Sequence, residues 1–132
     1  MNELRRHQLI QNIMAPHTEN VANGAISLWE KMAGQLVSII GEVAFDALYA
    51  RSIVRAQSTF SWLENGLDRQ FSPLRISLDG QAAEQAGEAN SLLLVIFTDI
   101  LASYIGEDLT GNILHSAWSD EESDAAKESQ NE

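Results

Sequence analysis

The chain has 132 residues, of which 45% are hydrophobic and 20% are charged, with a formal net charge of −11 and no cysteine. This length and composition are typical of one globular domain with a single hydrophobic core. The lack of cysteine excludes disulfides, thiolate metal sites and cysteine nucleophiles, and it is compatible with a reducing compartment. The negative charge argues against nucleic-acid binding, because phosphate contacts depend on clustered Lys and Arg.

The start of the chain and its longest apolar stretch both favour a cytoplasmic protein without membrane insertion. The basic pair Arg5 and Arg6 has no apolar run behind it, so this segment does not resemble a secretory signal. Residues 92–106 are too few to span a bilayer and carry Asp99 at their middle. We therefore expect residues 92–106 to form a buried core helix.

The first predicted element is an N-terminal helical arm over residues 1–17, which ends near Pro16. Residues 18–64 follow as a long helical block, because apolar side chains recur there at alternating spacings of four and three, which is typical of a coiled-coil seam. No proline interrupts this block, so it is predicted to be one helix, or two nearly collinear helices joined near Gly41. The seam positions are Ala22, Ile26, Trp29, Ala33, Leu36, Ile40, Val43, Ala47, Ala50 and Val54.

Three turn signals identify residues 65–81 as a connector, and its apolar members predict that it lies on the core. A second helical block is predicted over residues 82–118, and it is buried because it is apolar on almost every side. The last segment, residues 119–132, has six acidic residues, one lysine and a net charge of −5. With only two apolar residues it is predicted to be a mobile acidic tail, either solvating or able to bind a basic partner.

Two short segments 65 residues apart resemble each other. Residues 36–42 and 101–107 share Leu, Ser, Ile, Gly and Glu at matching positions, which favours two related helical halves about a pseudo-twofold axis. Each segment places a glycine, Gly41 or Gly106, inside a helical pattern, where glycine costs about 1 kcal/mol relative to alanine. This cost indicates a kink or a close helix crossing, with a ligand approaching the backbone as the alternative.

Acidic side chains at helical spacing are the candidates for chemistry. Three interpretations stay open for them: solvated helix faces, a metal site, or a buried polar network that sets helix register. The metal candidates are Glu42, Asp46, Asp99 and Glu107. The polar network would consist of Glu42, Arg51, Arg55 and Glu107.

Motifs of known enzyme classes are absent from the sequence. It contains no Gly-x-Ser-x-Gly, no glycine-rich phosphate loop and no His-Glu-x-x-His, and neither Glu42 nor Glu107 starts the Glu-x-x-His pair of di-metal carboxylate bundles. The three histidines are scattered and are predicted to lie at the surface or at helix ends. We therefore predict no cofactor and no catalytic residues.

The sequence thus predicts an all-α bundle of long amphipathic helices that is completed by homodimerisation, because one chain supplies few long helices to cover its apolar faces. Its function is predicted to be that of a non-enzymatic, regulatory or adaptor-like protein-interaction module with an unidentified protein partner. The alternatives are a protein that binds a small apolar ligand in an inter-helix cavity, and a metal-dependent enzyme using the clustered carboxylates. The predicted dimer interface consists of Ile26, Trp29, Leu36, Ile40 and Val43.

Overall fold

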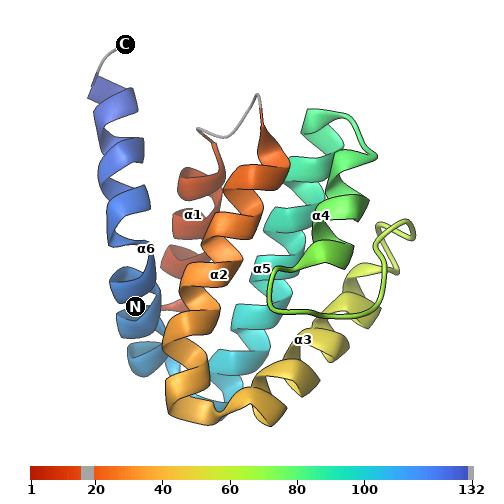
Figure 1. Cartoon of the computed structure of the whole chain (residues 1–132). Helices are drawn as coiled ribbons and strands as arrows, with labels where there is room; N and C mark the ends of the chain where they lie inside the picture. The colour runs from red at the N-terminus through yellow and green to blue at the C-terminus, as the bar shows by residue number, and fades with distance from the viewer. Residues whose placement is uncertain (16–19, 131–132) are drawn as a thin grey trace.

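The computed structural model describes residues 1–15 and 20–130, with side chains up to residue 121. Over these residues the chain forms helices and no β-strand, which confirms the all-α class and the helical bundle (Figure 1). The helices are α1 (Glu3–Met14), α2 (Val21–Ile40), α3 (Glu42–Ala56), α4 (Ser72–Asp79), α5 (Ala83–Ile105) and α6 (Glu107–Gln130).

Helix α1 is the predicted N-terminal arm, and it packs against α5 and α6. The side chain of Asn2 accepts a hydrogen bond from the backbone N–H of Arg5 and so caps the first turn. The inner face of α1 buries Arg6 together with Ile10 and Ile13. The helix ends at Met14, and Pro16, the predicted stop, lies outside the described residues.

Of the two alternatives predicted for residues 18–64, the structure has two helices joined at Gly41, but they are not nearly collinear. Helix α2 ends at Ile40, the chain changes direction sharply at Gly41, and α3 leaves at a wide angle to α2 (Figure 1). Gly41 has φ +87° and ψ 162°, a backbone conformation that is essentially restricted to glycine. Helix α3 then ends at Ala56 rather than near residue 64.

Gly106 forms a second corner of the same kind between α5 and α6, with φ +91° and ψ 158°. Each glycine N–H donates to the carbonyl four residues earlier, that of Val37 or Ala102, and so closes the preceding helix. Each glycine is followed at once by a glutamate, whose charge suits the positive first turn of the next helix. Both glycines predicted to mark a kink therefore lie at a helix boundary.

Replacing Gly41 or Gly106 with alanine is expected to lower the free energy of unfolding by about 1–3 kcal/mol at either position, because alanine does not readily adopt these angles. Apart from the glycine itself and its nearby backbone, no described atom lies within 4 Å of an added Cβ at either position, so the cost is conformational and not a clash. Urea unfolding measures it. Gly34→Ala is the matched control: this glycine lies inside α2 with equally open surroundings, and alanine there should stabilise the helix. Unchanged unfolding midpoints at both corners would contradict this expectation.

The connector begins earlier than predicted and contains the whole of α4. Residues 57–71 are non-helical, and Pro73 lies in the first turn of α4, where its missing N–H is tolerated. The backbone and side chain of Ser72 donate hydrogen bonds to the carboxylate of Asp68 and lower its pKa. Phe71, Leu74 and Leu78 are buried, so this segment lies on the core.

Helix α5 lies in the middle of the bundle and contacts each of the other five described helices. Its 23 residues are long and apolar enough to cross a membrane by length and composition alone. In this fold Leu93, Leu94, Phe97 and Leu101 of α5 are buried in the core, whereas Tyr104 near its end is 70% exposed. Trp29 of α2 meets Phe97 of α5 edge-to-face at the centre of the core, with ring centroids 5.1 Å apart.

The predicted start of the acidic tail at Ser119 does not coincide with the end of a helix. Helix α6 continues to Gln130, and residues 131–132 lie outside the described residues. The backbone of Trp118 departs from helical angles (φ −112°, ψ 18°), so a kink immediately precedes the acidic segment. Trp118 itself is fully buried, and its indole N–H donates to the carbonyl of Leu28.

Candidate functional site

The guanidinium of Arg6 joins three helices. Only 1% of this side chain is exposed. Its Nε and Nη2 donate to the two carboxylate oxygens of Glu107 at 3.1 and 2.8 Å, a bidentate ion pair with the first turn of α6. Its Nη1 donates to Thr98 Oγ1 at 2.9 Å and to the carboxylate of Asp99, both on α5. Arg6 therefore fixes the position of α1 against α5 and α6.

Electrostatic interactions favour the charged forms of Arg6 and Glu107. Burial works against the charge of Arg6, but hydrogen bonds and attraction from Glu107 and Asp99 outweigh it and raise the pKa of Arg6 above its ordinary value. The hydrogen bond from Arg6 in turn lowers the pKa of Glu107. Asp99 and Glu107 remain 38% and 33% exposed, so both carboxylates also meet water. The network joins α1 to α5 and α6 through Arg6, and of the residues predicted for a polar network it contains only Glu107.

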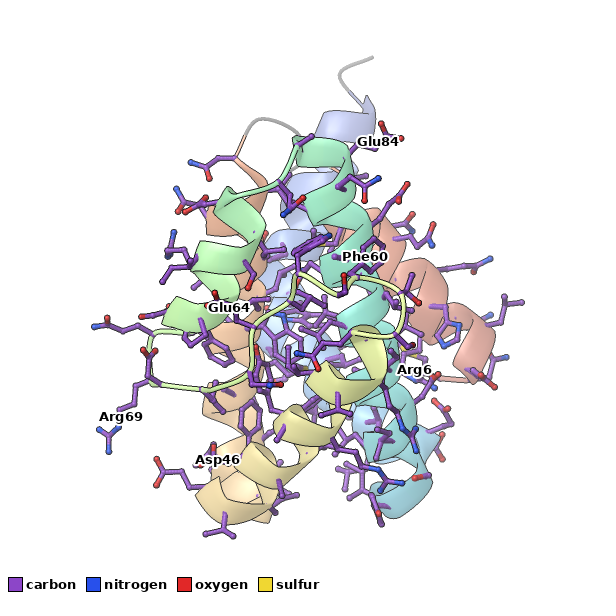
Figure 2. All side chains as sticks on the ribbon, turned by 90° about the vertical axis from the view of Figure 1, so that its right-hand side faces the viewer. Arg6, Asp46, Phe60, Glu64, Arg69 and Glu84 are labelled. Atoms are coloured by element: carbon purple, nitrogen blue, oxygen red, sulfur yellow. The ribbon has the colours of Figure 1, made fainter. Side chains whose placement is uncertain are left out.

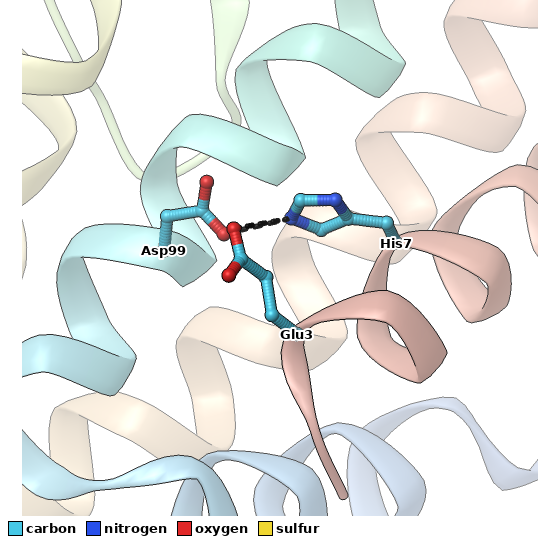
Figure 3. A group of neighbouring side chains, drawn as sticks. All are labelled: Glu3, His7 and Asp99. Carbon is cyan, nitrogen blue, oxygen red and sulfur yellow. Dashed lines mark hydrogen bonds and ion pairs between the residues drawn. The ribbon is translucent and has the colours of Figure 1, made fainter.

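Next to Arg6 lies a second cluster, which consists of Glu3 and His7 on α1 and Asp99 on α5 (Figure 3). His7 Nε2 is 2.8 Å from Asp99 Oδ1 and 4.0 Å from Glu3 Oε1. Their nearest nitrogen and oxygen atoms all lie within 4.8 Å of one another. In the part of the chain that the structure describes, this is the one group of three or more such side chains with atoms close enough to share a metal ion.

Glu3, Arg6 and His7 were not among the site residues predicted from the sequence. One signal could have identified Arg6: it lies four and seven residues before Ile10 and Ile13, so a charged side chain occupies the apolar face of the arm. A second signal was Asp99 in the middle of an apolar stretch. Two unlike charges on faces expected to be buried indicate an ion pair across helices.

The predicted carboxylate cluster is only partly assembled. Asp99 and Glu107 share Arg6, whereas Glu42 and Asp46 are exposed on α3 and form no hydrogen bond or ion pair through their side chains with the described residues. The predicted network partners Arg51 and Arg55 also lie at the surface, and Arg51 donates to the hydroxyl of Tyr104 at 3.3 Å. The corner at Gly41 places these four residues of α3 at the surface, away from Arg6.

Three of the five predicted interface residues lie in the core of the single chain. Ile26, Trp29 and Leu36 are at most 1% exposed, because α4, α5 and α6 of the same chain cover α2. They are therefore not available to a partner in this structure. Ile40 is half-buried and Val43 is 85% exposed, so only the end of the predicted seam reaches the surface.

The outer face of α3 is an exposed apolar stripe that consists of Val43, Ala47, Ala50 and Val54. It lies on the opposite side of the helix from the core residues Phe45, Leu48, Tyr49 and Ser52. Asp46 and Arg51 flank the stripe on its two sides (Figure 2 shows α3 at the front, with Asp46 projecting from it). No described segment of the chain covers this stripe.

An apolar groove of about 350 Å³ runs beside the stripe, between α3 and α5. Its walls are formed mainly by Ile40, Ala44, Ala47, Leu48, Ile100 and Tyr104. A more open hollow of about 650 Å³ lies between the C-terminal end of α1 and the N-terminal half of α5, and Glu84 and Glu88 form part of its wall. The α3 stripe and its groove form one largely apolar surface that the described part of the chain leaves uncovered, and the hollow beside α1 is another.

No protein-family model, curated protein or solved structure matches this chain. The function is therefore inferred from the geometry of the α3 surface and of the α1–α5 contact.

Proposed function

We propose that this protein is a non-enzymatic protein-interaction module that forms a homodimer through the outer face of α3. The observation that carries the proposal is the exposure of the α3 stripe, where Val43 is 85% and Val54 is 62% exposed. The stripe positions are spaced four, three and four residues apart, the spacing by which helices pair as coiled coils. A second copy would cover this face of both chains at once.

The charges beside the stripe favour a parallel pair of α3 helices. Val43 and Ala50 take the d positions of a heptad and Ala47 takes an a position, which places Asp46 at g and Arg51 at e. In parallel helices a g residue faces the e residue five positions later on the partner. Asp46 would then face the partner subunit's Arg51 on both edges of the contact. An antiparallel pair would instead place Asp46 on the same edge as the partner subunit's Asp46, and Arg51 on the same edge as the partner subunit's Arg51, so no pair between Asp46 and Arg51 would form across the contact.

The contact is small, because α3 has only 15 residues and two of the four stripe positions are alanine. We therefore expect a weak, concentration-dependent dimer rather than an obligate one. The two alanines allow the helix axes to approach closely, and the adjacent groove adds apolar surface for the partner to cover. A weak dimer suits the regulatory or adaptor-like role that the sequence predicts.

Charge reversal tests the dimer and its orientation together. Asp46→Arg and Arg51→Asp are each expected to raise the dimer dissociation constant severalfold, because each sets two like-charged pairs against each other. The double variant should restore the wild-type value, and an equimolar mixture of the two single variants should form a heterodimer. Sedimentation equilibrium over a concentration series measures all four samples, and circular dichroism confirms folding.

A Val43→Glu, Val54→Glu variant removes the apolar face and should be a folded monomer, because both side chains are exposed in the single chain. A wild-type protein that stays monomeric at millimolar concentration would contradict the dimer. A wild-type dimer that neither charge reversal weakens would contradict the parallel arrangement.

The fold also favours an origin in two related halves, α2–α3 and α5–α6. A pseudo-twofold axis that exchanges the halves would place α2 on α5 and α3 on α6, so a contact between α2 and α6 should be matched by one between α5 and α3. Both contacts are present. Core positions 65 residues apart are buried alike. These pairs include Leu28 and Leu93, Trp29 and Leu94, Met32 and Phe97, Leu36 and Leu101, and Tyr49 and Leu114.

A further inference from the structure

We propose that Glu3, His7 and Asp99 bind one Zn²⁺ ion between α1 and α5. Glu3 and His7 are one helical turn apart, so both side chains project from the same face of α1. Asp99 approaches from α5, and its Oδ1 is already 2.8 Å from His7 Nε2. The fold therefore brings three ligand types together at one point on the surface (Figure 3).

The donor set identifies the class of metal. One imidazole nitrogen and two carboxylates, with a fourth position left for water, suit Zn²⁺ in tetrahedral geometry. Mg²⁺ and Ca²⁺ prefer oxygen ligands throughout, so the histidine disfavours them. The exposed fractions of Glu3, His7 and Asp99 are 69%, 31% and 38%, so an ion can enter from solvent without unfolding the chain.

The charge of the surrounding network also suits a divalent cation. Glu3, Asp99 and Glu107 carry three negative charges and Arg6 carries one positive charge, which leaves a net charge of −2 when His7 is neutral. The two hydrogen bonds that join Asp99 to Arg6 and His7 both use Oδ1. Zinc at His7 Nε2 would replace the hydrogen bond between His7 and Asp99, because this nitrogen cannot hold the ion and the hydrogen bond at once. The carboxylate of Asp99 would then ligate the ion while Arg6 keeps its own hydrogen bond to Oδ1 and orients the carboxylate, as second-shell partners do.

Bound zinc would clamp α1 onto α5. Helix α1 is otherwise held by the Arg6 network and by apolar contacts such as those of Ile10 and Ile13. A ligand that binds only the folded protein stabilises it in proportion to its occupancy, so zinc should raise the temperature of unfolding. This effect does not depend on the α3 dimer, because the two surfaces share no residue.

The test is a titration of the full-length protein with zinc chloride, followed by calorimetry and by thermal unfolding. We expect one ion per chain at this site and a higher unfolding temperature, with no comparable effect of magnesium. His7→Gln should weaken binding by more than about tenfold, and Glu3→Gln should weaken it less. His115→Gln is the matched control, because this histidine lies on α6 outside the cluster, and zinc affinity should be unchanged.

The ring nitrogens of ¹⁵N-labelled histidine give a direct readout. Zinc should shift the His7 resonances at substoichiometric amounts while those of His115 stay in place. The proposal is overturned if zinc at millimolar concentration changes neither heat nor unfolding temperature. It is equally overturned if His7→Gln, shown by circular dichroism to be folded, binds zinc as tightly as the wild type, since binding would then reside elsewhere.

Discussion

The Asp99→Asn, Glu107→Gln double variant is expected to lose about 3 kcal/mol of unfolding free energy, because it leaves the guanidinium of Arg6 buried without a counter-charge. This value is at the lower end of the free energies lost when a buried ion pair is broken. The lower end applies because both carboxylates are about a third exposed, so that water partly screens their attraction to Arg6. Either single variant should cost clearly less, because one carboxylate still neutralises Arg6. Urea denaturation at neutral pH measures the loss.

Adding Arg6→Met to the double variant provides the control. It removes the uncompensated charge and fills much of the same space with an apolar side chain, so part of the lost stability should return. A triple variant less stable than the double variant would show that Arg6 stabilises the fold through packing or through Thr98 rather than through its charge pairs.

The pH dependence follows from the sign of the Glu107 shift. The hydrogen bond from Arg6 lowers the pKa of Glu107 below its ordinary value of 4.5. Ionised Glu107 therefore stabilises the fold above that pH, and this contribution is lost as the pH falls through the lower pKa of the folded state. The stability difference between wild type and Glu107→Gln should accordingly shrink as the pH falls below 4.5.

Trp29→Ala is expected to lose about 3–5 kcal/mol of unfolding free energy, because it leaves a large cavity at the centre of the core. The indole is fully buried and makes edge-to-face contacts with Tyr49 and Phe97, whose ring centroids are 5.3 and 5.1 Å away. Its N–H also donates to Asn90 Oδ1 at 2.8 Å, and loss of this donor leaves a buried acceptor without its partner. Thermal and urea unfolding measure the change.

Trp62→Ala is the matched control for this prediction. Trp62 is only partly buried, lies in the connector and packs on Phe60, so its loss should cost clearly less than that of Trp29. Equal losses at the two tryptophans would contradict the central role assigned to Trp29. Trp29→Phe should fall between them, since it keeps an aromatic ring but not the donor to Asn90.

The α3 surface and the zinc cluster lead to separable experiments. Charge reversal at Asp46 and Arg51 affects association and should leave zinc affinity unchanged. Substitution of His7 affects zinc affinity and should leave the dimer dissociation constant unchanged. Both sites use side chains that reach solvent, so these variants are expected to remain folded.

Local features of the sequence determined the helical class, both corner glycines and the connector that lies on the core. The 3.6-residue periodicity of apolar side chains reports that a helix has a buried face. A glycine within such a pattern destabilises a continuous helix and so indicates a break or a kink. Gly41 and Gly106 both lie at helix boundaries, where their positive φ angles are needed. These signals depend only on neighbours along the chain.

The tertiary structure alone decided what covers each apolar face and which charges meet. The seam of α2 looked available to a second chain, but α4, α5 and α6 of the same chain bury it, and only the α3 part of the seam stays exposed. Arg6 meets Asp99 and Glu107 across 93 and 101 positions of sequence. Periodicity shows that a face is buried without showing its partner, because the partner is set by the angles at Gly41 and Gly106 and by the packing of whole helices.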